Sequence, residues 1–214
     1  MRAFSIAQKY GPELNNIYIH KKKIYTMKKA SYADKDVVVN ILSQSFINDP
    51  HINWLLEESK NKNKLKIIMG YVFEESLARG TVYLNDDNTA VALWNTEKKE
   101  KVSLQYIVRN LSFLFRNGLT TTRRCLKTDT LTYEQYPKNA KYCQLYLVGV
   151  LPEYQGKGLG SALMNPMIEE MEKESIPMHL ETANARNVKI YMKKGFNIIK
   201  TFQLGNNTFY CMSR

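Results

Sequence analysis

The segment from Leu145 to Glu174 constrains the fold more than any other part of the chain. Residues 145–151 are apolar with β-branched members, which is typical of a buried strand. Pro152 ends that strand because proline has no N–H to donate to a sheet. From Ser161 onward, apolar side chains recur at helical spacing, at Leu163, Met164, Met167, Ile168 and Met171. The segment therefore predicts a strand, a loop and a helix in direct succession.

The loop between this strand and this helix is Gln155-Gly-Lys-Gly-Leu-Gly160. Glycine lets the backbone adopt unusual dihedral angles and approach a ligand closely. The first N–H groups of a helix have no intrahelical partner and lie at the positive end of its dipole, so they favour an anion such as phosphate. Lys157 adds a positive charge. The alternative is a tight turn that needs only small residues, since glycine-rich patterns often arise by chance.

Two common phosphate-binding motifs are absent from this loop. The Walker motif requires Ser or Thr after the loop lysine, where this chain has Gly158. The dinucleotide motif requires a third glycine where this chain has Ser161, which argues against a nicotinamide oxidoreductase. The loop does fit Q-x-x-G-x-G, through Gln155, Gly158 and Gly160. In this it resembles the coenzyme A pyrophosphate loop of the GNAT superfamily of N-acetyltransferases.

A second motif extends the resemblance downstream. Met178–Thr182 (MHLET) predicts the next strand, and residues 184–196 follow with the pattern N-x-x-N-x-x-x-Y-x-x-x-G-F. Asn187 and Tyr191 are four residues apart, so they share one helix face. The pattern is similar to the closing pattern of the GNAT family, in the expected order after the glycine loop.

The resemblance implies a GNAT fold: an α/β (mixed α+β) domain whose central, mostly antiparallel mixed sheet has splayed strands and helices on both faces. We expect a single domain over residues 24–214, preceded by an N-terminal extension at 1–23. A variable helical insertion at about 98–138 would shape the acceptor pocket or form a subunit contact, which would permit a homodimer.

The resemblance also assigns residues to acetyl-CoA. In the family, the splayed strand pairs its backbone with the pantetheine arm, and the glycine loop holds the pyrophosphate. The residues that match cofactor-binding positions are Val148, Gly149, Val150, Gln155, Gly156, Lys157, Gly158, Leu159, Gly160, Ser161 and Asn187. Tyr191 matches the general acid that donates a proton to the departing thiolate, a task that suits a neutral phenol. The alternative is a tyrosine whose ring packs into the core.

The implied reaction is transfer of an acetyl group from acetyl-CoA to a primary amine, with a small-molecule acceptor favoured over a protein. The general base stays open among Glu181, Glu134 and Asp129, or none of them. The alternative function is a non-catalytic sensor or scaffold that binds CoA or an acyl-CoA, because a fold does not guarantee an activity.

Aromatic residues in the first half of the chain are candidate acceptor contacts. Helical spacing predicts helices over residues 34–48 and 64–79. In the GNAT family the loop between the first two helices borders the acceptor site, which makes Phe46, Trp54 and Tyr71 candidates. Their alternative interpretation is as ordinary core aromatics.

Net charge, cysteine and histidine spacing and the length of apolar runs indicate which classes of partner to expect. The net charge of +11 is compatible with nucleic acid, an anionic surface or a polyanionic cofactor. Beyond residues 20–23 and 123–124, the sequence shows neither basic residues clustered with aromatics nor a known nucleic-acid-reading motif, so we expect no nucleic-acid partner. The three cysteines and three histidines show no metal-site spacing, so no metal is expected. No apolar run approaches the ~20 residues that span a bilayer, and no signal-peptide core is present, so we expect no membrane partner and a cytoplasmic location.

Overall fold

The computed structural model describes residues 17–20, 23–57, 61–98, 100–138 and 140–214. Most of the expected extension at residues 1–23 lies outside the described residues. The strands are β1 (Ile17–His20), β2 (Lys23–Lys29), β3 (Gly80–Asn85), β4 (Ala90–Thr96), β5 (Cys143–Val150), β6 (Met178–Thr182), β7 (Asn197–Leu204) and β8 (Asn207–Ser213). The α-helices are α2 (Lys35–Ser45), α3 (Pro50–Leu55), α4 (Lys62–Arg79), α5 (Leu104–Tyr133), α6 (Leu159–Lys173) and α7 (Ala185–Met192).

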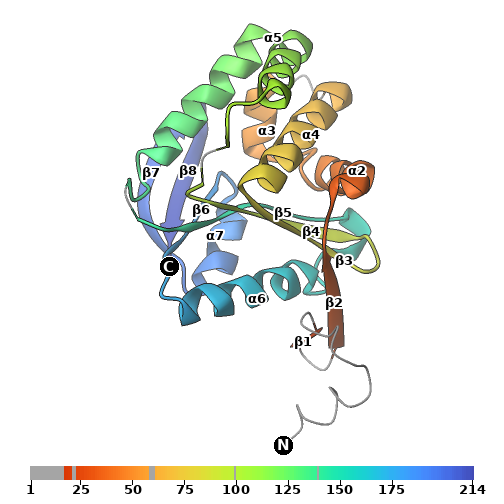
Figure 1. Ribbon diagram of the computed structural model, residues 1–214. Helices are drawn as coiled ribbons and strands as arrows, with labels where there is room; N and C mark the ends of the chain where they lie inside the picture. The colour runs from red at the N-terminus through yellow and green to blue at the C-terminus, as the bar shows by residue number, and fades with distance from the viewer. Residues whose placement is uncertain (1–16, 21–22, 58–60, 99, 139) are drawn as a thin grey trace, which may run out of the picture.

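The strands form one open sheet in the order β1-β2-β3-β4-β5-β6-β8-β7. β5 and β6 run parallel, and the other neighbouring pairs are antiparallel. Helices α2, α3, α4 and α5 lie on one side of the sheet, and α6 and α7 lie on the other (Figure 1). The expected fold class is confirmed: a mixed α/β domain with a mostly antiparallel sheet and helices on both faces.

Strand β4 separates the two halves of the core. Its side chains alternate, as they must in a pleated strand. Val91 and Leu93 belong to the cluster packed with α2 and α4, whereas Ala90, Ala92 and Trp94 belong to the cluster packed with α6. All five are buried, so β4 lies at the centre of the domain.

The sheet opens between β5 and β6. β5 pairs with β4 from Cys143 to Val150, with one bulge between Leu93 and Trp94. Its ladder with β6 contains only the three pairs that join residues 143–145 to residues 178–180. The described ladder therefore leaves residues 146–150 without a partner on the β6 side. This is the strand that the resemblance identified as splayed.

Helix α5 fills most of the expected insertion at 98–138. The sequence predicts a helix over residues 102–116 and a partly helical segment over residues 120–136. In the structure α5 likewise consists of two helical segments, which are separated at Gly118 by a non-helical φ of 83° and ψ of 168°. The first half packs on α4, and Phe113 is buried there against Tyr71. None of the helices in the described part of the chain is both long and apolar enough to span a membrane.

The turn between β3 and β4 depends on the buried side chain of Asn85. Its amide oxygen accepts hydrogen bonds from the N–H groups of Thr89 and Ala90 at 2.8 and 2.7 Å, and its amide nitrogen donates to the Thr89 hydroxyl at 2.9 Å. Because truncation leaves these groups buried without a partner, Asn85→Ala should lower the free energy of unfolding by about 2–3 kcal/mol. Urea unfolding measures this. The exposed Asp87→Ala in the same turn is the control, and an equal loss in both variants would contradict the role of Asn85.

Candidate active site

A cavity of about 220 Å³ lies at the opening between β5 and β6. β5 contributes residues 144–148 to its wall, β6 contributes Glu181 and Thr182, and α7 contributes Asn187 and Tyr191. Helices α3, α4 and α5 complete the wall from the other side. Of the residues that the sequence assigned to the site, Val148, Asn187 and Tyr191 thus come together around one cavity.

The other two assigned residues of β5 lie outside the cavity wall. A Cβ atom on Gly149 would lie 3.1 Å from both the Leu42 Cδ2 and the Ser45 Oγ, so packing against α2 accounts for glycine there. The carbonyl oxygen of Val150 accepts hydrogen bonds from the Ser45 hydroxyl at 2.9 Å and from the Gln155 amide at 3.1 Å. Gln155 therefore ties the glycine loop back to the end of β5.

The glycine loop ends at the start of α6. Gly156 and Gly158 have φ values of 75° and 87°, which L-residues with a side chain rarely adopt. Nothing lies within 4 Å of a Cβ built at either position, so backbone conformation rather than crowding requires glycine there. Gly160 has no such requirement, since a Cβ would meet Val148 and Val150 at the ordinary distances of 3.6 and 3.7 Å.

The N-terminus of α6 has no side-chain cap. Gly158 occupies the N-cap position, and the Ala162 N–H is the first to bond back, to the Gly158 carbonyl at 3.0 Å. The N–H groups of Leu159, Gly160 and Ser161 make no described hydrogen bond. Uncapped N–H groups at the positive end of a helix suit a phosphate, and no atom lies within 4 Å of a Cβ built at Gly156 or Gly158. Lys157 lies nearby with its Nζ 4.7 Å from the centroid of the Tyr154 ring.

Tyr191 combines the two interpretations that the sequence left open. Its ring is buried and contacts Phe196 edge-on, at 6.3 Å between ring centroids. Its side chain also lines the cavity, and the hydroxyl makes no described hydrogen bond. Burial, with a smaller contribution from the Asp49 carboxylate, raises the pKa of Tyr191 well above its ordinary value. The phenol therefore keeps its proton throughout the neutral pH range.

Of the three candidate bases, two carboxyl groups line the cavity: Glu181 and Asp129. Burial raises the pKa of Glu181 to about 7, although hydrogen bonds donated by the Tyr136 hydroxyl and, at 3.0 Å, by the Gln144 amide oppose that rise. Burial also raises the pKa of Asp129 to about 7. Glu134 is exposed beyond the end of α5 and lies outside the wall. No group of three or more His, Cys, Asp or Glu in the described residues could hold a metal ion.

Two of the three candidate aromatic contacts line the cavity in the structure, and the third does not. Phe46 and Tyr71 line the cavity. Trp54 does not, because its ring packs beside the backbone of Gly205, where a Cβ would lie 2.6 Å from the Trp54 Cδ1. The sequence could not separate the three, because residue type alone does not distinguish an aromatic in the core from one that lines a cavity. It also missed Asp49, His51 and Phe209 as wall residues.

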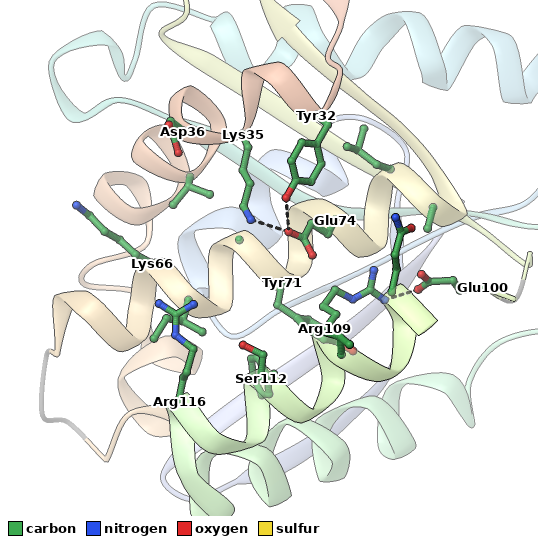
Figure 2. Close-up of a pocket in the computed structure, with 18 of the residues that line it drawn as sticks. Tyr32, Lys35, Asp36, Lys66, Tyr71, Glu74, Glu100, Arg109, Ser112 and Arg116 are labelled. Atoms are coloured by element: carbon green, nitrogen blue, oxygen red, sulfur yellow. Dashed lines mark hydrogen bonds and ion pairs between the residues drawn. The ribbon is translucent and has the colours of Figure 1, made fainter. Parts of the chain in front are cut away.

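A larger groove of about 1140 Å³ lies between α2, α4 and α5 (Figure 2). It contains none of the residues that the sequence assigned to the cofactor or to catalysis, and it shares only Tyr71 and Phe113 with the cavity. Figure 2 shows Tyr32 and Lys35 pointing toward Glu74, and the Lys35 Nζ lies 2.6 Å from that carboxylate. The smaller cavity is therefore the candidate active site.

Comparison with known proteins finds similarity in the part of the chain that contains the glycine loop, Asn187 and Tyr191. Residues 128–196, from the end of α5 to the end of the second motif, match the acetyltransferase (GNAT) family. A mycothiol acetyltransferase of Propionibacterium freudenreichii is 38% identical over 61 residues, which are 27% of this chain and 20% of that protein. A probable serine/threonine-protein kinase of Dictyostelium discoideum is 26% identical over 211 residues, which are 85% of this chain and 22% of that protein. The chain thus spans about a fifth of the length of these two relatives.

Solved structures share the fold over nearly the whole chain. A histone acetyltransferase HPA2 and related acetyltransferase from Corynebacterium glutamicum superposes with a TM-score of 0.64 at 21% identity, covering 88% of this chain and 94% of that one. Arylalkylamine N-acetyltransferase 2 from Aedes aegypti has a TM-score of 0.63 at 14% identity, covering 89% and 98%. Residues 128–196 thus match the GNAT family, and the fold of nearly the whole chain is shared with solved acetyltransferase structures.

Proposed function

We propose that this domain transfers an acetyl group from acetyl-CoA to the primary amine of a small-molecule acceptor. The observation that carries the proposal is the cavity at the opened edge of β5, where Asn187 and Tyr191 meet two carboxyl groups of raised pKa. The names of the mosquito and actinobacterial proteins, which are an arylalkylamine N-acetyltransferase and a mycothiol acetyltransferase, support an acetyl transfer.

The chain offers acetyl-CoA three contacts. The uncapped N-terminus of α6 and Lys157 would hold the pyrophosphate. The unpaired edge of β5 at residues 148–150 would hold the pantetheine arm as an added strand, with the Asn187 amide close by. When bound, acetyl-CoA supplies the acetyl group as a thioester, so a C–N bond to the acceptor forms while the C–S bond breaks.

Two side chains move the protons of this exchange. The Glu181 carboxylate takes the proton that an ammonium acceptor must lose before its nitrogen can attack. The Tyr191 hydroxyl gives its proton to the departing sulfur and regains one from the new amide nitrogen. Each turnover therefore forms one amide and one thiol and releases one proton, which reaches solvent by way of Glu181. A non-catalytic CoA sensor is the competing function, and it would bind CoA without releasing thiol.

Cofactor binding is the first test. At about 100 times its dissociation constant, acetyl-CoA should stabilise the protein by ~2.7 kcal/mol, as should CoA, whereas NAD and ATP should not. Thermal unfolding measures this. Gly158→Ala should lose the CoA shift, since a Cβ would enter the space before the helix N-terminus.

Gly118→Ala is the matched control for this test. Gly118 also has a positive φ, of 83°, and open space around it, and its ψ of 168° lies in a region that is almost restricted to glycine, so alanine carries at least as much backbone strain there. This variant should keep the full CoA shift. If wild type gives no shift with either CoA or acetyl-CoA, the loop is not a CoA site and the proposed function is wrong.

Tyr191→Phe tests the proton donor. The variant should lower kcat by about 10²–10⁴-fold with an unchanged dissociation constant for CoA, because only the hydroxyl is removed. Tyr210→Phe, which removes a hydroxyl outside the cavity wall, is the control. Thiol release in a screen of amines measures turnover. Full turnover in Tyr191→Phe would assign the residue to the core alone.

The pH dependence tests the base. Because burial raises the pKa of Glu181 to about 7, kcat/KM should fall as pH drops through 7, where the carboxylate gains a proton and cannot accept another. Glu181→Gln should reduce kcat/KM at every pH and remove the dependence that belongs to this carboxylate. The exposed Glu134→Gln should behave as wild type. An unchanged profile in Glu181→Gln would exclude it as the base.

A further inference from the structure

The charge of the cavity is opposite to the charge of the protein. The chain carries a net charge of +11, yet the ionisable acidic side chains in the cavity wall are Asp49, Asp129 and Glu181, and no Lys or Arg is among its described wall residues. His51 also lines the cavity, but burial lowers its pKa to about 4, so it is neutral at pH 7. Above the pKa of about 7 that burial gives Asp129 and Glu181, a bound molecule therefore meets negative charge that no lysine or arginine of the described wall offsets.

Asp129 is the carboxyl group in this wall that lacks a partner of its own. Asp49 caps α3 by accepting hydrogen bonds from the N–H groups of His51 and Ile52 at 2.9 and 3.2 Å, and Glu181 is held by Tyr136 and Gln144. The Asp129 side chain makes no described hydrogen bond or ion pair. Asp129 is half-buried, and a carboxylate that loses part of its contact with water without gaining a partner is destabilised, which favours a ligand that supplies one.

The arginine near Asp129, Arg79, is paired with other groups. The Arg79 Nη1 lies 2.5 Å from the Glu75 carboxylate and 2.5 Å from the Tyr133 hydroxyl. Arg79 lowers the pKa of Asp129 only partly, because the charges of Glu75 and Glu181 act in the opposite direction. Around this end of the cavity, the carboxyl groups of Glu75, Asp129 and Glu181 thus outnumber the one guanidinium, which belongs to Arg79.

The rest of the wall is apolar and aromatic. The rings that line it belong to Phe46, Tyr71, Phe113, Tyr133, Tyr146, Tyr191 and Phe209. Aromatic faces attract cations as well as apolar groups. The volume of about 220 Å³ is below the roughly 300–1,000 Å³ of sites for drug-sized ligands, so the occupant is small.

We propose that Asp129 forms an ammonium-binding subsite, which selects as acceptor a small primary amine that enters as a cation and carries an apolar or aromatic body. That such an amine is the acceptor rests on the proposed acetyl transfer. That the subsite binds an ammonium cation does not depend on it. Asp129 acts here as a binding and positioning residue, and Glu181 remains the group that takes the proton.

Titration of Asp129 adds a second signature. Burial and the charge of Glu75 raise the pKa of Asp129 to about 7, so an ammonium binds best above this pH, where the carboxylate is ionised. Affinity for the cation should therefore fall as pH drops from 8 to 6. The titratable and charged groups that face Asp129 are Glu75, Arg79 and Tyr71 on α4, Cys125 and Tyr133 on α5, Tyr146 on β5 and Glu181 on β6.

The test uses three probes of similar shape and different charge: 2-phenylethylammonium, 2-phenylethanol and phenylacetate. Calorimetry measures their binding to the full chain in the presence of CoA, which cannot donate an acetyl group. We expect the cation to bind more tightly than the alcohol and phenylacetate to bind least. Asp129→Asn should weaken the cation roughly 10- to 100-fold and leave the alcohol unchanged.

Glu134→Gln is the matched control, because it removes one negative charge five residues away, outside the cavity. It should bind all three probes as wild type does. Equal binding of the three probes by wild type, or an equal loss for cation and alcohol in Asp129→Asn, would overturn the subsite. The probe series in wild type needs no variant, so equal binding of the three probes overturns the subsite even if Asp129→Asn folds poorly.

The two proposals fail in different ways. If CoA shifts the unfolding temperature but the cation does not bind, the acetyltransferase proposal stands and the ammonium subsite is wrong. If CoA gives no shift, the same probes are titrated without it. Cation-selective binding that depends on Asp129 then supports the subsite, and its absence overturns it.

Discussion

The separation of β5 from β6 is the constraint on which the rest of the site depends. A parallel pair that stayed in register along its whole length would bury the backbone of β5 on both sides. The ladder instead stops after three residue pairs, so the second half of β5 keeps a free edge. The cavity forms at that edge, and the helices on the two sides of the sheet supply its wall.

Each side of the sheet has a separate task. On one side, the glycine loop and α6 present uncapped N–H groups, and Gln155 anchors the loop to the end of β5. On the other side, the kinked α5 contributes Asp129 and Tyr133, and α4 contributes Tyr71. The uncapped N–H groups of α6 and the carboxyl group of Asp129 thus lie on opposite sides of the sheet in a protein of net charge +11. The net charge alone carries no information about the charge at the site, because it sums over the whole surface.

The strand–loop–helix unit and the second motif could be predicted closely because their signals are local. The MHLET segment predicts Met178–Thr182, which is the observed extent of β6. Gly195 has φ of 84° just after α7, as its place in the motif requires. Less local expectations fared worse. Trp54, a candidate acceptor contact, packs beside Gly205 rather than in the cavity.

The sequence by itself determined the family resemblance, the order of the elements and the pair Asn187 and Tyr191 on one helix face. These follow from spacing along the chain, where neighbours in sequence are neighbours in space. Only the tertiary structure decided which carboxyl groups face the cavity. Asp129 and Glu181 are 52 positions apart in the sequence and are brought into the wall of one cavity by tertiary packing, whereas Glu134 is exposed and lies outside that wall. Burial, which raises the pKa of both wall carboxyl groups, exists only after that packing has formed.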